Sequence, residues 1–247
     1  MGHRQGGTAI GAASTAELVI PASPASQKVL SAAQVASIGA YLARQMEGPV
    51  RVQLFVDGPG CEACEVTGRV LQQVQEASRK VSVNVTLASG SRRQGQDLDR
   101  LPEARVFTRN GNHVRFLGTQ VGVEVTSLVQ TIADASLERA PLPPDALKRA
   151  AALPEGSWLR VFVGAACTHC PGAVRSAVAL ALANRSLSVD VVQTADFPDL
   201  GRSFKISAVP TTVVNGRAFF QEGRSPVEVL EALYANPPKD GEGHTRS

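Results

Sequence analysis

Apolar and polar positions follow the same order of patterns twice along the chain. Residues 50–56 are mostly apolar, as in a buried strand, and residues 81–87 alternate apolar with polar, as in a half-buried strand. A segment with apolar residues at helical spacing lies between them. The same order returns at residues 158–163 and 187–192, again with a helical segment between the two strands. The pattern therefore predicts two copies of one α/β unit.

Each predicted unit closes with a hairpin and a helix. The first hairpin contains Asn110-Gly111, a dipeptide typical of type I′ turns, and the second turns on Asn215-Gly216. The hairpin strands are expected at 104–108 and 113–117, then at 211–214 and 217–221, and the closing helices at 123–135 and 226–234. Strand, helix, strand, helix, hairpin and helix in this order suggest mixed sheets with helices on both faces.

Capping residues and polar segments place the remaining elements. Ser31 is expected to cap a helix that ends near Met46, and a second helix is expected at 145–153. Residues 89–96 are polar and predict a loop, which leads into a short helix ending at Arg100.

Proline-rich and low-complexity stretches mark the boundaries of the two units. The prolines of residues 140–144 cannot continue a helix, so the first unit is expected at 27–138 and the second at 139–235. Residues 1–26 are rich in Gly, Ala, Ser and Pro without periodicity, and we expect a disordered tail or an upstream extension. Residues 236–247 are polar and are expected to form a second disordered tail.

Composition and charge exclude several classes of function. The net charge of +3 and the aromatic content of 4% give no basic stripe or stacking platform, so no nucleic-acid partner is expected. No apolar run approaches 18 residues, and Glu17 interrupts the weakly apolar start, so neither a membrane span nor a signal peptide is expected. Close pairing of the cysteines favours a cytoplasmic location.

The four cysteines form two CxxC pairs, Cys61–Cys64 and Cys167–Cys170, each between a predicted strand and a predicted helix. At a helix start, unpaired backbone N–H groups and the helix dipole favour a thiolate, which is the nucleophile of disulfide exchange. Pro102 follows Cys61 by 41 residues and Pro210 follows Cys167 by 43 residues. Each pair therefore belongs to a repeated arrangement that includes a distant proline.

The surroundings of the two pairs differ in charge. His169, as a donor or a cation, would stabilise the Cys167 thiolate and make that disulfide more oxidising. Glu62, Glu65 and Asp57 would disfavour the Cys61 thiolate. We therefore predict that Cys167 is the faster nucleophile and better oxidant, and that Cys61 is slower and more reducing. Two alternatives stay open: His169 has no effect from an exposed loop, or solvent screens the acids.

These motifs resemble a known family. A CxxC pair followed some 40 residues later by Val209-Pro210-Thr211 and a hairpin resembles the thioredoxin superfamily. Two such units, with VFTRNGNHVRFLGTQVGVEV in the first and CTHCPGAVR in the second, resemble the tandem glutaredoxin-like protein disulfide oxidoreductases over residues 27–235. The resemblance implies an α/β fold of two tandem thioredoxin-fold units. Each unit would have a mixed central sheet flanked by helices, and the two sheets would join edge to edge.

The resemblance also implies site residues. The peptide bonds before Pro102 and Pro210 would be cis, and the backbones of Leu101 and Val209 would bind an extended substrate segment. The chain departs from the family at Thr168-His169, where Pro-Tyr is frequent. It also lacks the buried acid that the thioredoxin branch places six residues before the first cysteine, so proton transfer needs another group or water.

We therefore expect a thiol–disulfide oxidoreductase in which Cys167 attacks a substrate disulfide and Cys170 resolves the mixed disulfide. The cysteine pairs take the place of a cofactor, and NADPH would act only indirectly, through a thioredoxin-reductase-like flavoprotein that the resemblance implies. Expected partners are that flavoprotein, protein disulfide substrates and, as a further candidate, a peroxidase. The alternatives are an electron relay dedicated to a peroxidase and a metal-binding scaffold, since two CxxC pairs supply enough sulfur ligands for zinc.

Overall fold

The computed structural model describes residues 29–88, 98 and 100–238. The tail expected at 1–26, most of the tail expected at 236–247 and the loop expected at 89–96 lie outside the described residues. The short helix expected to end at Arg100 lies mostly outside them as well.

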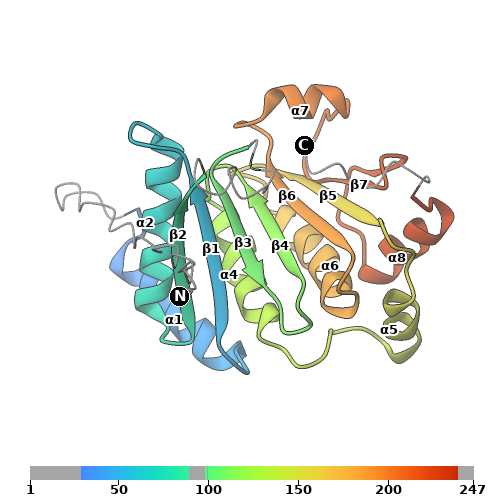
Figure 1. The fold of residues 1–247 in the computed structure, drawn as a ribbon, viewed down its shortest axis with the longest axis horizontal. Helices are drawn as coiled ribbons and strands as arrows, with labels where there is room; N and C mark the ends of the chain where they lie inside the picture. The colour runs from blue at the N-terminus through green and yellow to red at the C-terminus, as the bar shows by residue number, and fades with distance from the viewer. Residues whose placement is uncertain (1–28, 89–97, 99, 239–247) are drawn as a thin grey trace, which may run out of the picture.

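The described strands form one mixed sheet of eight strands in the order β2-β1-β3-β4-β6-β5-β7-β8 (Figure 1). The strands are β1 Val50–Val56, β2 Val81–Leu87, β3 Glu103–Phe107, β4 His113–Leu117, β5 Trp158–Val163, β6 Ser188–Gln193, β7 Thr211–Val214 and β8 Ala218–Phe220.

The strand pairing repeats in the two units. In the first unit β1 pairs in parallel with β2 and antiparallel with β3, which forms a hairpin with β4. In the second unit β5 pairs in the same way with β6 and β7, and β7 forms a hairpin with β8. The predicted α/β fold of two repeated units is confirmed.

The units join through β4 and β6, which pair in parallel from Val114↔Val189 to Leu117↔Val192. This pairing confirms the expected edge-to-edge union. It also directs the carboxyl ends of β4, β6 and β5 to the same edge of the sheet.

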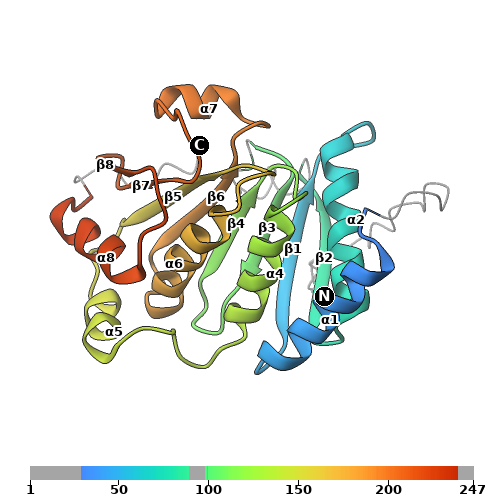
Figure 2. The ribbon, with the colours of Figure 1, turned by 180° about the vertical axis from the view of Figure 1, so that it is seen from behind.

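Most of the described helices cover one face of this sheet (Figure 2). On that face α4 packs against α6, and α1 packs against α2 and α4. The described helices are α1 Ala32–Gln45, α2 Glu62–Ala77, α4 Glu124–Ala135, α5 Pro144–Ala151, α6 Cys170–Ala183, α7 Pro198–Ser203 and α8 Pro226–Ala235.

Alternation along the strands produces a core on each side of the sheet. In β5, Leu159 and Val161 join the large core under the helices, whereas Trp158 and Phe162 face the other side. There they form a second apolar cluster with residues at and beside α7, including Leu200. The short helix α7 therefore covers the face opposite to the main helical layer, as expected for helices on both faces.

The two hairpin turns differ although both contain Asn-Gly. Asn215 and Gly216 both have positive φ, at 47° and 70°, as the expected type I′ turn requires. In the first hairpin only Gly111 has positive φ, so the type I′ expectation is wrong there. The turn is longer, because the Thr108 N–H donates to the Asn112 carbonyl. The Asn110 amide instead donates to the carbonyls of Ala181 and Leu182 in the second unit.

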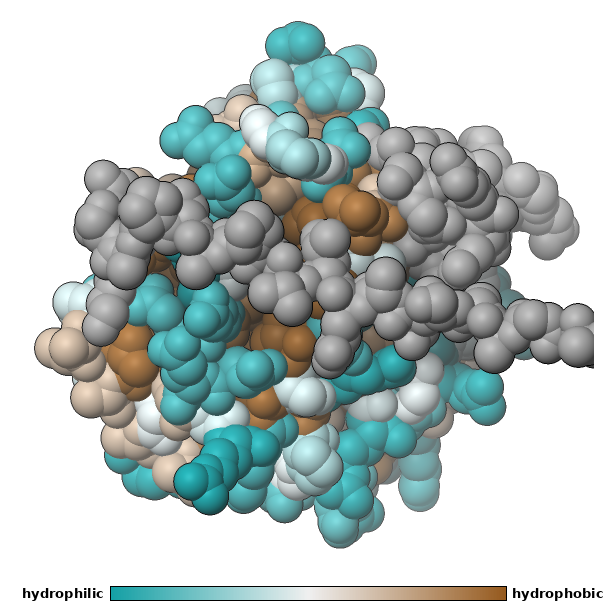
Figure 3. Space-filling model, turned by 60° about the vertical axis from the view of Figure 1, so that its left-hand side comes forward, coloured by the Kyte–Doolittle hydropathy of each residue, from teal (hydrophilic) through white to brown (hydrophobic). Residues whose placement is uncertain are grey.

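Apolar areas on the described surface are small in the view of Figure 3, where polar side chains separate them. Among the residues that the structure describes, no helix has both the length and the apolar character that a membrane crossing requires.

Buried Asn112 ties the first hairpin to the second unit. Its amide donates to the carbonyls of Asn184 and Leu187 at 3.0 and 2.9 Å. We expect Asn112→Ala to lower the free energy of unfolding by about 2–3 kcal/mol, because buried carbonyls lose their donor. Urea unfolding of the oxidised protein measures this change. Asn84→Ala, at an exposed position of β2, is the control, and an equal effect of both substitutions contradicts the prediction.

Candidate active site

The second cysteine pair lies in a turn between β5 and α6. The Cys167 N–H donates to the Gly164 carbonyl, and the Cys170 N–H donates to the Cys167 carbonyl. Cys167 and Cys170 form a disulfide. Cys167 is partly exposed, whereas Cys170 is fully buried as the first residue of α6. The more exposed cysteine, Cys167, is therefore the one expected to act as the nucleophile.

The first pair is arranged differently relative to its helix. Cys61 is the N-cap of α2, and its Sγ accepts a hydrogen bond from the Cys64 N–H at 3.2 Å. The two residues form a disulfide in which Cys61 is partly exposed and Cys64 is buried. Cys61 thus meets the helix N–H groups expected for both cysteines, whereas Cys167 precedes its helix by a full turn. The Cys64 N–H favours a thiolate at Cys61, whereas the nearby acids disfavour it. That Cys167 is the faster nucleophile and the better oxidant therefore stays a prediction.

His169 is exposed and is the N-cap of α6, but its side chain makes no capping hydrogen bond. Glu62 and Glu65 both lie in the first turn of α2, next to Cys61. His169 and the two glutamates thus lie at the starts of the helices that follow the cysteine pairs. Their effect on the stability of the two thiolates stays a prediction.

Both distant prolines are buried, and the Leu101–Pro102 and Val209–Pro210 peptide bonds are cis. Among the described residues, Leu101 and Val209 have no partner for their backbone N–H and C=O groups. Val209 lies against the loop of Cys167, since a Cβ atom at Gly164 would lie 3.3 Å from Val209 Cγ2. The structure thus places Val209, and with it the cis bond to Pro210, beside the loop that leads to Cys167.

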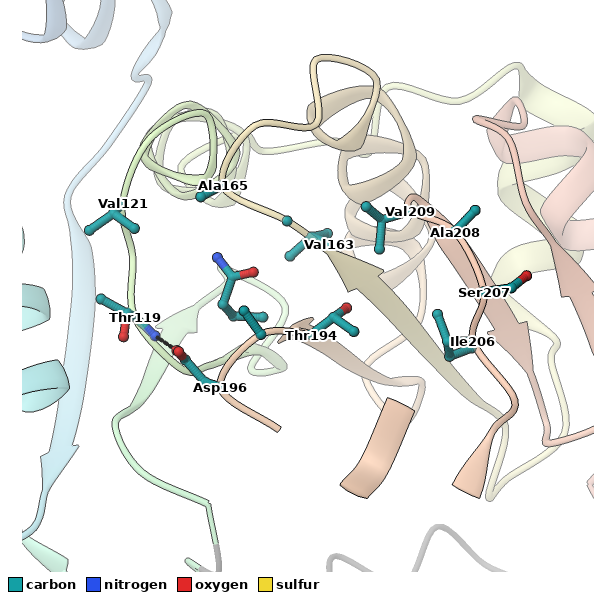
Figure 4. A pocket seen from close by; sticks show the side chains of 13 residues that line it. Thr119, Val121, Val163, Ala165, Thr194, Asp196, Ile206, Ser207, Ala208 and Val209 are labelled. Carbon is teal, nitrogen blue, oxygen red and sulfur yellow. Dashed lines mark hydrogen bonds between the residues drawn. The ribbon is translucent and has the colours of Figure 1, made fainter. Parts of the chain in front are cut away.

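A cleft of about 400 Å³ opens beside this loop (Figure 4). Thr119 and Val121 of the first unit form one side, and residues 206–209 form the opposite side. The Thr119 N–H donates to Asp196 Oδ2 across the junction of the units. The other lining residues are Val163, Gly164, Ala165, Gln193, Thr194 and Ala195.

The first unit contacts the Cys167 loop directly. The Val123 N–H donates to the Ala165 carbonyl at 2.9 Å, and a Cβ atom at Gly122 would lie 2.3 Å from the same oxygen. Gly122 also has a φ of +60°, so a larger residue there is excluded both by space and by conformation. On the other side, the Gln120 N–H donates to Thr67 Oγ1 on α2. One short segment therefore contacts both the helix that follows the first cysteine pair and the loop that leads to the second pair.

Glu124 follows this segment as the first residue of α4 and was not identified from the sequence. Its side chain is 1% exposed, and its carboxylate oxygens have no hydrogen-bond partner among the described residues. Burial raises the pKa of Glu124 to about 7, with a smaller opposing effect from nearby Ser127. The sequence signal was weak, because one glutamate at a helix start is typical of ordinary dipole pairing.

Glu124 lies on the same side of α4 as a residue that contacts the helix carrying Cys170. Glu124, Ser127, Thr131 and Asp134 form a buried polar stripe at helical spacing on α4. Asp134 at its far end pairs with Arg175 of α6 at 2.9 Å, so the stripe faces α6. The contact between Val123 and Ala165 places the starts of α4 and α6 at the same end. Glu124 therefore lies at the end of α4 that is next to the loop leading to Cys167.

The thioredoxin domain family matches residues 159–232, which include Cys167, Cys170 and Pro210. The second unit thus matches a thioredoxin domain, and the chain as a whole has the tandem thioredoxin fold. Two solved structures with a similar fold each cover most of the chain. The NTD_N/C domain of alkylhydroperoxide reductase from Enterococcus faecalis matches with a TM-score of 0.73 and 22% identity, covering 83% of this chain and 99% of that one. A protein disulfide oxidoreductase from Aeropyrum pernix matches with a TM-score of 0.75 and 22% identity, covering 88% and 97%.

Longer curated proteins match this thioredoxin-fold chain as well. An NADH dehydrogenase from Ferdinandcohnia aciditolerans is 31% identical over 186 residues, which cover 71% of the chain and 35% of that protein. An alkyl hydroperoxide reductase component from Pseudomonas putida is 28% identical over 124 residues, which cover 50% of the chain and 24% of that protein. The chain thus spans about a third or less of these relatives. Together with the two cysteine pairs, they support an oxidoreductase with thiol–disulfide chemistry.

No group of three His, Cys, Asp or Glu side chains within the described part of the chain could hold a metal ion. The two cysteine pairs lie in separate units, each closed as a disulfide. This arrangement gives no support to the alternative in which the four sulfurs share one zinc ion.

The raised pKa of Glu124 predicts a pH-dependent stability. Folded Glu124 keeps a proton that the unfolded chain releases above its pKa of about 4.3. The contribution of this proton to the free energy of unfolding is therefore fully present below about pH 4 and is lost as the pH rises through 7. The loss is on the order of 3 kcal/mol. We expect Glu124→Gln to be more stable than the wild type at pH 8 by a comparable amount and similar to it near pH 4.

Urea unfolding of the oxidised proteins at both pH values measures this difference. Glu138→Gln is the control, because the Glu138 side chain is 71% exposed. Parallel stability–pH curves for the wild type and Glu124→Gln contradict the raised pKa.

Proposed function

We propose that the chain is a protein disulfide oxidoreductase that works mainly through Cys167 and Cys170. The observation that carries the proposal is the pairing of a partly exposed cysteine with a buried one, beside the backbone of Val209, which has no hydrogen-bond partner among the described residues. An extended substrate segment adds to that backbone as a strand and brings its disulfide to Cys167.

The reaction has two exchanges. The Cys167 thiolate attacks one sulfur of the substrate disulfide, and the other substrate sulfur leaves as a thiolate and takes up a proton. The Cys170 thiolate then attacks Cys167, which releases the second substrate thiol and forms the Cys167–Cys170 disulfide. The substrate gains two electrons and two protons, and a reductase must return two electrons to the cysteine pair.

Buried Cys170 needs a proton acceptor for the second exchange. Glu124 fits this role, because its pKa of about 7 lets it hold or release a proton near neutral pH. It stands in for the acid that is absent from Phe55 and Val161, six residues before the first cysteines. The first unit thereby contributes a positioned base to the second site.

A second candidate function is an electron relay to a peroxidase. The observation that favours it is the match to the Pseudomonas putida alkyl hydroperoxide reductase component over half of the chain. In this case a flavoprotein reductase would pass electrons from NAD(P)H to Cys167–Cys170, either directly or through Cys61–Cys64, and the chain itself would need no further cofactor. Both functions suit a reducing compartment such as the cytoplasm.

Trapping of the mixed disulfide tests the proposed roles. In a Cys61→Ser/Cys64→Ser background, Cys170→Ser is expected to accumulate a disulfide between Cys167 and a protein substrate such as insulin, because the resolving thiol is missing. Cys167→Ser, its matched control, is expected to accumulate none. Non-reducing gels and mass spectrometry measure the adduct. Equal trapping by both variants contradicts the assignment of Cys167 as nucleophile, and rapid turnover of a peroxidase alone favours the relay.

A further inference from the structure

The cleft beside Val209 lies where the two units meet. Three parallel strands, β4, β6 and β5, end at it, and ligands of α/β sheets bind outside such carboxyl ends. Its volume of about 400 Å³ has room for a long side chain. Val209 lines it, so a substrate strand bound to that backbone passes along its rim.

The lining combines apolar walls with hydrogen-bond acceptors. Val121, Val163 and Ile206 supply apolar surface. Gln193 is 3% exposed, and its Oε1 atom has no partner among the described residues. A buried acceptor without a donor is costly, so a bound group that donates to it gains binding energy.

The charge of the lining residues indicates which kind of substrate side chain the cleft would bind. Asp196 is the one charged residue among those that line the cleft, and it is exposed. One of its oxygens accepts from the Thr119 N–H, which holds the carboxylate at the rim. A carboxylate and an amide oxygen without a partner, in a cleft that also has apolar walls, suit an aliphatic stem that ends in a cationic donor.

We propose that this cleft selects protein substrates with a lysine or arginine next to the reactive cysteine. The inference rests on the proposed disulfide exchange and names the substrate class of the same site. The aliphatic part of the basic residue packs between Val121 and Ile206, and its cationic end reaches Gln193 and Asp196. An anionic thiol such as glutathione is disfavoured by the same carboxylate.

The test compares disulfide-linked peptides that differ only in the residues flanking the cysteine, which are lysine, leucine or glutamate. For the reduced full-length chain we expect kcat/KM to fall in the order lysine, leucine, glutamate, with about tenfold between the extremes. Glutathione disulfide, measured in parallel, is expected to be a poorer substrate than the lysine peptide.

Two variants test whether the cleft selects the substrate, and a third variant is the control for general effects on the fold. Asp196→Asn keeps an oxygen for the Thr119 N–H but loses the charge, and it is expected to reduce the lysine-to-glutamate ratio about threefold. Val121→Trp fills the cleft and is expected to raise KM for the lysine peptide about tenfold with little change in kcat. Val227→Trp, at an exposed position of α8, is the matched control and is expected to leave KM unchanged.

The outcomes distinguish this inference from the proposed function. Equal kcat/KM values for the three peptides, or a ratio that Asp196→Asn leaves intact, overturn the basic-side-chain pocket while disulfide exchange stands. A preference for glutathione disulfide over every peptide also overturns it. If the wild-type chain reduces no disulfide at all, the proposed function fails, and the inference fails with it.

Discussion

The parallel pairing of β4 with β6 is the interaction on which the rest of the molecule depends. An isolated unit would leave both of these strands as open edges, with unpaired backbone groups. Their union makes one eight-stranded sheet and buries α4 between the sheet, α1 and α6. It also sets Arg115 of β4 against Asp190 of β6 at 3.0 Å, with both side chains almost fully buried. A shifted strand would separate this buried pair, which favours the observed register, and Arg160 and Glu103 complete the buried charge network within the two units.

The same pairing determines the composition of the active site. Because β4 ends beside β5 and β6, the segment after it meets the loop of Cys167, and Val123 binds Ala165 there. The first unit then adds Glu124 on the helical side of the sheet and Thr119 and Val121 at the cleft. In the proposed function the two units are therefore not equivalent. The second cysteine pair has groups of the first unit beside its loop, whereas four strands of the sheet separate β1, which leads to the first pair, from the hairpin β7–β8 of the second unit.

Much of this organisation could be predicted from the sequence because it depends on local signals. The apolar and alternating patterns predicted β1, β2 and β5 with the bounds that the structure has. Ser31 caps α1 as expected, and the structure adds a full capping box with Gln34. The first hairpin turn differed because its Asn110 side chain is used for tertiary bonds to α6, which local propensity does not describe. Glu124 and the cleft could not be predicted for a related reason. Both arise from residues more than 40 positions apart that meet only when β4 pairs with β6.

The pH dependence of mixed-disulfide resolution tests most directly whether the first unit completes the second site. A disulfide is formed between Cys167 and a peptide, and the release of peptide thiol by Cys170 is followed by stopped flow from pH 5 to 9. The account predicts that the rate in the wild type rises with an apparent pKa near 7, and that Glu124→Gln lacks this rise and is at least about tenfold slower at pH 8. The same profile and rate in both proteins would contradict it.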